Sequence, residues 1–504
     1  MGARVRSWLL FLLVGLALAG LTVVLRADIA PADVFLQAGD LLSREWRFRD
    51  ALVMYGRAEN AAEGGAQRVR ATLGVASSAV RVAEFELAYM KAARLVQMLP
   101  QDLEVRTVYG QAAWSAGLFA EAEAAFRDVL AARPRDVRAL LGTARVLTAH
   151  NRLEDALDAA LAAAAGDPND ADSASVVAST YKRMRRMDDA AAWYTKYLSL
   201  LPLREADKRV WTQGEIQFLR SFGRKAPAQL DPRARGVVHT IPFRLVDDKV
   251  MVKGRVNDSE WVEFALDTGA EQTVLSQTTA HRLGVTPLSG TISAGVGEMG
   301  LRGLQNGRLE SLQIGSLVVT NVPCLIKTPP LAELPNRESE SFSPLALGLS
   351  VVIDYNRREV LLGDRIAREE HEVQLPLWFT RLATVRGVVN AETSASFIID
   401  TGGQVVSISQ DTARTLSVQP YGRRISLLVF GTSGRDRDAY LLPGVSVKFD
   451  SLALDNFSVV VLNLRAPSVL LGYRVGGTVG HHFLSKYRVT FDLNRSVLGL
   501  SRGR

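Results

Sequence analysis

Several features are scarce in this 504-residue sequence, and each scarcity argues against one class of site. Cys324 is the only cysteine, so no disulfide can form within the chain. It lies in the apolar run of residues 322–326, where we expect it to be packed inside a strand rather than to act as a nucleophile. The net charge is +7, but no concentrated Lys/Arg tract is interleaved with aromatic residues. The charge therefore indicates a basic surface and no nucleic-acid site.

Two motifs lack the residues that would complete them. The Gly-rich segment 295–300 has no following Gly-Lys-Ser/Thr and precedes strand-like sequence, so it is not typical of a phosphate loop. His481 and His482 are adjacent and have no evident third ligand, which argues against a metal site. The sequence thus implies no metal and no organic cofactor.

A long uncharged run lies near the start of the chain. Residues 8–25 carry no charge and follow Arg4 and Arg6. This length is at the short end for a membrane-spanning helix, and the two arginines favour an N-terminus on the inside. A cleaved signal peptide is the alternative, with residues 17–19 as an imperfect cleavage site. The pattern predicts a cytoplasmic segment 1–7, a single-pass anchor 8–25 in an inner or plasma membrane, and a periplasmic or extracellular remainder.

The next part of the chain repeats with a period of 34 residues. Alanine recurs 12 positions before each proline of a regularly spaced series. The prolines are Pro100, Pro134, Pro168 and Pro202, and the alanines are Ala88, Ala122, Ala156 and Ala190. This pattern resembles the tetratricopeptide repeat, and about five copies fit residues 32–204. The resemblance implies an all-α solenoid of helix pairs with a groove for a protein partner. Residues 205–236 are expected to form an exit helix and a linker.

Two Asp-Thr-Gly triplets are the most informative feature of the second half. Asp267-Thr268-Gly269 and Asp400-Thr401-Gly402 each follow an apolar run and precede further apolar positions. An ionised acid at the end of a buried strand is costly, so it needs a reason. Two such acids brought face to face cannot both ionise and must share a proton. Such a pair can activate water against a peptide carbonyl.

The repetition extends beyond the triplets. Two small or apolar residues and a glycine occur again 81 positions after the first Asp, ending at Gly348, and 80 positions after the second, ending at Gly480. Asp354 and Asp492 then precede Asn-Arg pairs, and we expect both to lie in surface turns. A shared order over this distance argues for duplication.

Residues 237–504 resemble the pepsin/retropepsin superfamily of aspartic proteases, especially the retropepsin-like domains of bacteria. The resemblance implies a mostly-β fold with two lobes, residues 237–366 and 367–504, and a peptide or protein substrate. It makes Asp267 and Asp400 the catalytic pair. It also implies that Thr268 and Thr401 hydrogen-bond across the lobe interface.

The same resemblance assigns the glycines. Gly269 and Gly402 would allow close backbone approach. Gly348 and Gly480 would pack behind the catalytic loops. The segment 295–300 and its counterpart 431–434 are placed where the family has a flap over the substrate.

Two departures from the family pattern stand out. Residues 481–487 resemble a short helix of the family that lobe 1 is expected to lack, which would weaken the support behind Asp267. Gly403 stands where Ser or Ala is usual, and we expect it to loosen the loop around Asp400.

The sequence therefore predicts a membrane-anchored aspartic endopeptidase whose repeats bind a substrate or partner. A non-catalytic scaffold that keeps the protease fold only for binding is the alternative. A close carboxylate pair favours the enzyme, and lobes splayed apart favour the scaffold.

Overall fold

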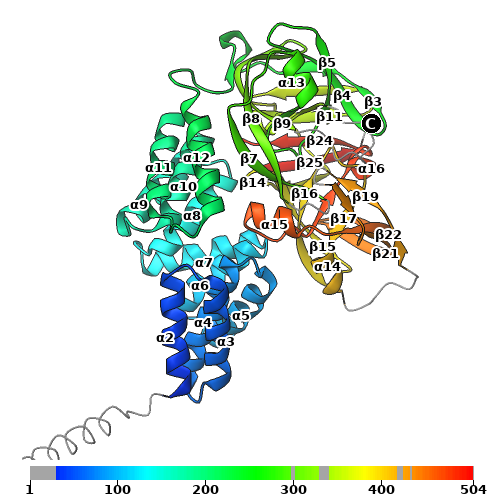
Figure 1. The fold of residues 1–504 in the computed structure, drawn as a ribbon. Helices are drawn as coiled ribbons and strands as arrows, with labels where there is room; N and C mark the ends of the chain where they lie inside the picture. Colours follow the sequence, from blue (N-terminus) through cyan, green and yellow to red (C-terminus); the bar gives the residue numbers. More distant parts are fainter. Residues whose placement is uncertain (1–29, 297–300, 328–339, 417–423, 432–433, 503–504) are drawn as a thin grey trace, which may run out of the picture. The chain divides into compact units, whose positions relative to one another are not determined.

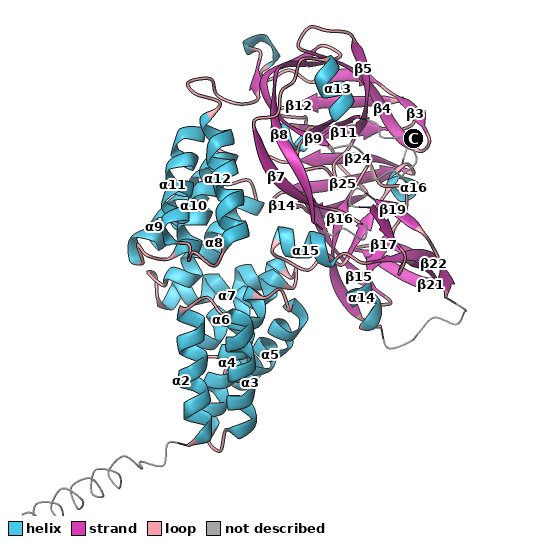
Figure 2. Cartoon of the chain, viewed as in Figure 1, coloured by secondary structure: helices cyan, strands magenta, loops and turns pink. Residues whose placement is uncertain are grey.

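The computed structural model describes residues 30–296, 301–327, 340–416, 424–431 and 434–502. The chain divides into two units, residues 1–108 and 109–504. From α2 to α12 the described elements are all helices, and strands dominate after α12 (Figure 2). Within the described ranges, no helix has the length and apolar character needed to cross a membrane. The predicted anchor, residues 8–25, lies outside those ranges.

The first unit contains consecutive helix pairs joined by short turns (Figure 1). Its complete helices are α2 (Pro31–Arg44), α3 (Phe48–Ala61), α4 (Gly65–Arg81) and α5 (Phe85–Met98). Glycines at the helix crossings make the close packing possible. A Cβ added at Gly39 or Gly74 would lie 2.7 or 2.4 Å from the ring of Tyr55. The small residues of the tetratricopeptide pattern thus leave space for one aromatic ring between the helices.

The second unit begins within the repeat helices. They are α6 (Leu103–Ser115), α7 (Phe119–Ala132), α8 (Val137–Ala149), α9 (Leu153–Gly166), α10 (Ala171–Arg183), α11 (Met187–Leu200) and α12 (Ala206–Arg220). Phe126 is the equivalent of Tyr55 in these helices, because a Cβ at Gly110 or Gly142 would lie 2.6 or 2.3 Å from its ring. Trp211 of α12 packs edge-on against Tyr194 of α11 at 5.9 Å. An all-α, tetratricopeptide-like solenoid therefore precedes the strands.

Lobe 1 is built on a nine-stranded sheet. Its strands are β1 (Gln229–Leu230), β3 (Arg244–Val246), β4 (Lys249–Val256), β5 (Trp261–Leu266), β6 (Thr273–Ser276), β7 (Ser289–Ala294), β8 (Leu301–Ile314), β9 (Leu317–Lys327) and β10 (Glu340–Phe342). The short elements are η1 (Pro232–Ala234), α13 (Gln277–Arg282) and η2 (Leu345–Leu347). Strand β1 pairs with β9, so the sheet begins inside the predicted linker. Cys324 is fully buried in β9, and burial raises the pKa of its thiol to about 12, which confirms the packing role.

Lobe 2 repeats this plan in an eight-stranded sheet. Its strands are β14 (Trp378–Phe379), β15 (Ala383–Val389), β16 (Thr393–Ile399), β17 (Ser407–Ser409), β18 (Ile425–Ser426), β21 (Tyr440–Phe449), β22 (Leu452–Leu462) and β23 (Gly477–Val479), with the hairpin β19 (Val429–Gly431) and β20 (Gly434–Asp436) beside them. The helices are α14 (Gln410–Arg414), α15 (Arg465–Leu471) and α16 (His481–Leu484). Matching serines start matching helices: Ser276 Oγ accepts from Thr279 N, and Ser409 Oγ accepts from Thr412 N.

A six-stranded antiparallel sheet joins the lobes within one chain. Its order is β13-β25-β24-β11-β12-β2, with β2 (His239–Pro242), β11 (Ser350–Asp354), β12 (Glu359–Gly363), β13 (Val373–Pro376), β24 (Tyr487–Asp492) and β25 (Val497–Arg502). Asp354 and Asp492 end the two central strands and are 7% and 6% exposed. The expected turns follow both residues and are exposed at their Asn-Arg pairs, but the two aspartate side chains are buried and not at the surface. Asp354 accepts from Arg357 N, and Asp492 accepts from Asn494 N and Arg495 N. Asp354 also pairs at 2.6 Å with Arg488, its register partner on β24 from the other lobe.

Candidate active site

Each triplet follows the buried end of a strand. The strands β5 and β16 end in Leu266 and Ile399, which are 1% and 2% exposed. A parallel neighbour fixes each aspartate. Asp267 N donates to Phe342 O of β10 at 2.9 Å, and Asp400 N donates to Val479 O of β23 at 3.0 Å. The same strand arrangement thus presents both acids.

The two threonines hold the triplets together by reciprocal hydrogen bonds. Thr268 N donates to Thr401 Oγ1, and Thr401 N donates to Thr268 Oγ1, each at 3.1 Å. The hydroxyl of Thr268 donates to Ile399 O, and that of Thr401 donates to Leu266 O, each at 2.7 Å. Both side chains are buried, so the polar groups of these four hydrogen bonds are satisfied only while the lobes stay in register.

Glycine is required at the third position because the opposite acid lies directly against it. A Cβ at Gly269 would stand 2.5 Å from Oδ1 of Asp400, and one at Gly402 would stand 2.8 Å from Oδ1 of Asp267. The geometry brings the two carboxyl groups to a common site between the lobes. The lobes are therefore not splayed apart.

The carboxyl groups differ in their hydrogen bonds. Asp267 Oδ1 accepts from Gly269 N at 2.9 Å. Asp400 Oδ1 accepts from both Gly402 N at 2.9 Å and Gly403 N at 3.0 Å. The second donor to Asp400 is the backbone N–H of Gly403, and the expectation that glycine loosens this loop stays a prediction. The additional donor favours the charged form of Asp400.

Electrostatics favour one shared proton. Burial, reinforced by the charge of Asp400, raises the pKa of Asp267 to about 7, against the pull of Lys327 and Lys249. Burial also raises the pKa of Asp400, but hydrogen bonds from Gly403, Gly402 and Asp267 oppose that rise. The pair titrates jointly, with the proton favoured on Asp267 and the charge on Asp400. A water between such groups can lose a proton to one while the other polarises a carbonyl.

The support behind lobe 1 differs from the sequence prediction. Strand register aligns Phe342 with Leu266 as it aligns Val479 with Ile399, so Ser343 occupies the position equivalent to Gly480. Gly348 lies five residues further on, where it ends η2 with φ of +66°. The assignment of Gly348 behind the Asp267 loop is therefore wrong. The prediction relied on spacing along the chain. A small-apolar-Gly pattern also occurs where η2 ends, only five residues beyond the true equivalent position.

The two lobes hold their loops by different groups. In lobe 2, Gly480 packs against the loop, with a Cβ placed 2.7 Å from Gly403 O, and His481 N donates to that carbonyl at 2.8 Å. In lobe 1, Pro344 follows Ser343 and has no N–H to donate. The Ser343 hydroxyl donates to Ala270 O at 2.6 Å instead. Lobe 1 was expected to lack the short helix altogether, but η2 is its three-residue counterpart.

Ser343 was not predicted as a supporting residue. The sequence signal for it is a hydroxyl residue followed by an apolar one at residues 341–342, which matches residues 478–479 but is not followed by glycine. The hairpin β7–β8 carries the predicted flap 295–300, of which residues 297–300 lie outside the described ranges. Its counterpart, β19–β20, surrounds residues 432–433, which also lie outside them.

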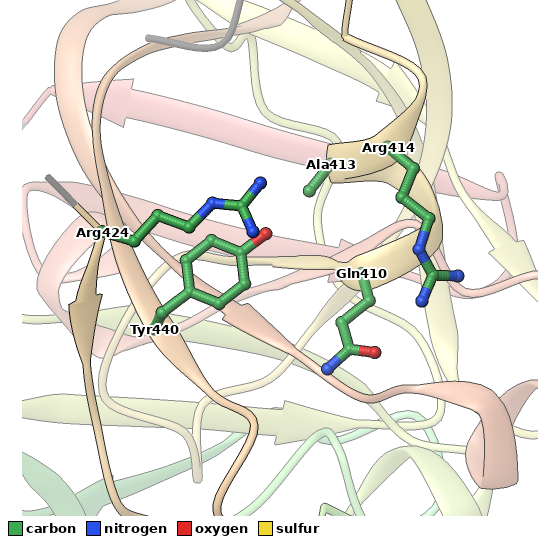
Figure 3. A pocket seen from close by; sticks show the side chains of 5 residues that line it. All are labelled: Gln410, Ala413, Arg414, Arg424 and Tyr440. Carbon is green, nitrogen blue, oxygen red and sulfur yellow. The ribbon is translucent and has the colours of Figure 1, made fainter. Parts of the chain in front are cut away.

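A separate shallow pocket lies beside α14, away from the triplets. Gln410, Ala413, Arg414, Arg424 and Tyr440 line it, and the Arg424 guanidinium lies 4.8 Å from the centre of the Tyr440 ring (Figure 3). Arg414 is paired with Asp411 at 2.8 Å. None of these residues contributes to the carboxylate pair.

Comparisons with known families agree with the two resemblances. The family model described as gag-polyprotein putative aspartyl protease matches residues 252–334 and again residues 385–475. A tetratricopeptide repeat model matches residues 109–171. The double match confirms a duplicated aspartic-protease-like region preceded by tetratricopeptide repeats. No curated protein matches the chain.

Solved structures similar to the chain come from both groups. An aspartic proteinase from Irpex lacteus is 12% identical, covers 53% of this chain and 97% of its own, and has a TM-score of 0.32. A thermophilic tetratricopeptide protein from Thermus thermophilus is 22% identical, covers 37% of this chain and 98% of its own, and has a TM-score of 0.32.

Proposed function

We propose that this chain, which joins tetratricopeptide repeats to an aspartic-protease-like domain, is an aspartic endopeptidase. The observation that carries the proposal is the reciprocal contact of Gly269 with Asp400 and of Gly402 with Asp267. It supports a carboxylate pair close enough to share one proton. A scaffold would need no such pair, and two desolvated acids are costly to keep.

The proposed chemistry follows from the unequal pair. Asp400, ionised and held by two backbone N–H groups, takes a proton from the attacking water. Asp267, protonated, donates a hydrogen bond to the scissile carbonyl oxygen, where negative charge develops. The water oxygen bonds to the carbonyl carbon, and Asp400 then passes the proton it took from water to the leaving amide nitrogen. The C–N bond breaks, the carboxylate of Asp400 is restored, and Asp267 keeps its proton. Access is available because both aspartates keep part of their surface exposed.

The repeat helices and residues 8–25 suggest how a substrate is brought to the active site. We propose that the repeat helices bind a protein partner or a substrate segment and that residues 8–25 tether the chain to a membrane. Tethering raises the effective concentration of a substrate without new contacts at the active site.

A mixed peptide library tests the enzymatic proposal. The full chain is incubated with the library from pH 3 to 8, with and without a statine-type inhibitor, and cleavage is read by mass spectrometry. We expect inhibitor-sensitive cleavage by the wild type and none by Asp267→Asn or Asp400→Asn. If the wild type cleaves nothing while a statine-type compound still binds it, the scaffold alternative is favoured. Cleavage that survives in either variant would rule out the shared pair as its source.

A further inference from the structure

One arginine of the repeat helices contacts the protease region directly. Arg185 lies in the turn between α10 and α11, with φ of +62°. Its Nη1 donates to Ala228 O at 2.7 Å, and its Nη2 donates to Leu347 O, the last residue of η2. Arg185 thus joins the last repeat to the segment that follows β10 in lobe 1.

Gly348 leaves room for this contact. A Cβ there would stand 3.0 Å from Arg185 Nη2, and the φ of +66° favours glycine. The half-buried guanidinium is paired, among the described residues, with carbonyl oxygens and with no carboxylate. Burial lowers the pKa of Arg185. A cation held at the carboxyl end of a helical turn by its carbonyl is a favourable arrangement.

A short chain of buried contacts leads from Leu347 to Asp267. Leu347 N donates to Pro344 O at 3.0 Å, and Leu345 and Leu347 are packed in the core. Pro344 follows Ser343, whose hydroxyl holds Ala270 O in the catalytic loop. The residue before Ser343 is Phe342, whose carbonyl accepts from Asp267 N.

The same helix end also reaches lobe 2. Arg183 Nη1 donates to Thr380 O at 3.4 Å, and its guanidinium lies 4.5 Å from the centre of the Phe379 ring. The residue after Thr380, Arg381, donates through Nε to Glu271 of the Asp267 loop at 2.8 Å. One turn of the solenoid therefore contacts segments that lead to the catalytic loop from both lobes.

We propose that Arg185 is a positioning residue for Asp267, so that this one contact of the last repeat supports the active site and the repeat is not only a device for recruitment. Lobe 2 holds its loop with the backbone N–H groups of α16, whereas η2 is shorter and is preceded by Pro344, which has no N–H to donate. Arg185 fixes the far end of η2 from outside the lobe. This inference rests on the proposed function for its kinetic consequence, but its structural consequence can be measured without any substrate.

The first test is hydrogen–deuterium exchange of the full chain. Arg185→Ala is compared with Arg186→Ala, a matched control in the same turn whose exposed side chain pairs with Asp189 at 2.8 Å. We expect faster exchange in residues 263–276 and 340–350 for Arg185→Ala alone. Gly348→Ala places a methyl group against the same guanidinium and should give the same exchange pattern. Unchanged exchange in both segments, or a uniform increase over the whole chain, would overturn the proposal.

The second test is kinetic. With a short peptide that avoids the repeats, Arg185→Ala should lower kcat by roughly 10- to 100-fold with KM within a few-fold, because small misplacements of a catalytic group are costly. Arg186→Ala should stay within about two-fold of the wild type, because an exposed ion pair contributes little. Equal kcat values for the two variants would overturn the positioning role. If the wild type has no activity but the exchange pattern appears, the positioning contact stands and the enzymatic proposal fails.

Discussion

The two catalytic loops reach one geometry with different supporting groups. In lobe 2 a glycine and a helical N–H group lie behind the loop, and two backbone donors hold the Asp400 carboxylate. In lobe 1 a serine hydroxyl replaces the helical N–H, and one backbone donor holds Asp267. The two lobes therefore match more strictly in the positions of their acids than in the residues that hold them. The unequal number of backbone donors also explains why the two carboxyl groups differ in their affinity for the shared proton.

The largest expected effect comes from removing either acid. Asp267→Asn and Asp400→Asn should each lower kcat/KM at least about 1,000-fold, because both carboxyl groups act on the same water and carbonyl. Steady-state hydrolysis of a library-derived peptide measures the loss. A circular dichroism spectrum equal to the wild type serves as the folding control. A variant that keeps more than about a tenth of the activity would show that its aspartate is not required in the way the other one is.

Substitutions of the residues that support the two catalytic loops should lower the stability of the protein by different amounts. Gly480→Ala places a methyl 2.7 Å from three backbone atoms of the loop, so we expect a loss of about 3 kcal/mol or more, or failure to fold. Ser343→Gly removes one hydrogen bond and should cost about 1–2 kcal/mol. Chemical denaturation of both variants measures the difference. Similar losses in the two variants would mean that the supports are not distinct.

Asp267→Asn should also change the pH dependence of stability. The pKa of Asp267 is raised from its ordinary 3.8 to about 7, so the unfolded chain loses this proton at lower pH than the folded chain does. The carboxyl group therefore destabilises the fold increasingly as pH rises from about 4 to 7. The asparagine variant should gain on the order of 1–4 kcal/mol over the wild type at about pH 8 and little at about pH 4. A gain that is independent of pH would contradict the raised pKa.

The threonine pair should give the most symmetric effects. Thr268→Val and Thr401→Val each remove a hydroxyl that donates to one carbonyl and accepts one N–H across the lobes. We expect each to cost about 1–3 kcal/mol because buried groups lose their partners. Thr→Ser at either position keeps the oxygen and should recover most of the loss. Thermal unfolding that is sensitive at only one of the two positions would show that the contact is not reciprocal.

Local chemistry made part of this molecule predictable. The 34-residue spacing of the prolines and the duplicated Asp-Thr-Gly triplets can be recognised in the sequence alone, and both indicated the right elements. Gly348 was misassigned because the residue behind the loop is set by the register of β10 against β5, which sequence spacing does not reveal. Arg185 could not be found at all. It is one of 60 lysines and arginines, and only the folded chain brings its turn to Leu347.

The pH dependence of kcat/KM tests the shared proton most directly. The full chain is assayed on one peptide from about pH 3 to 9, with salt held constant. We expect a bell-shaped profile whose alkaline limb falls through about pH 7, where the pair loses its second proton. A rate that stays level or rises above that pH would contradict a mechanism in which Asp267 and Asp400 share one proton.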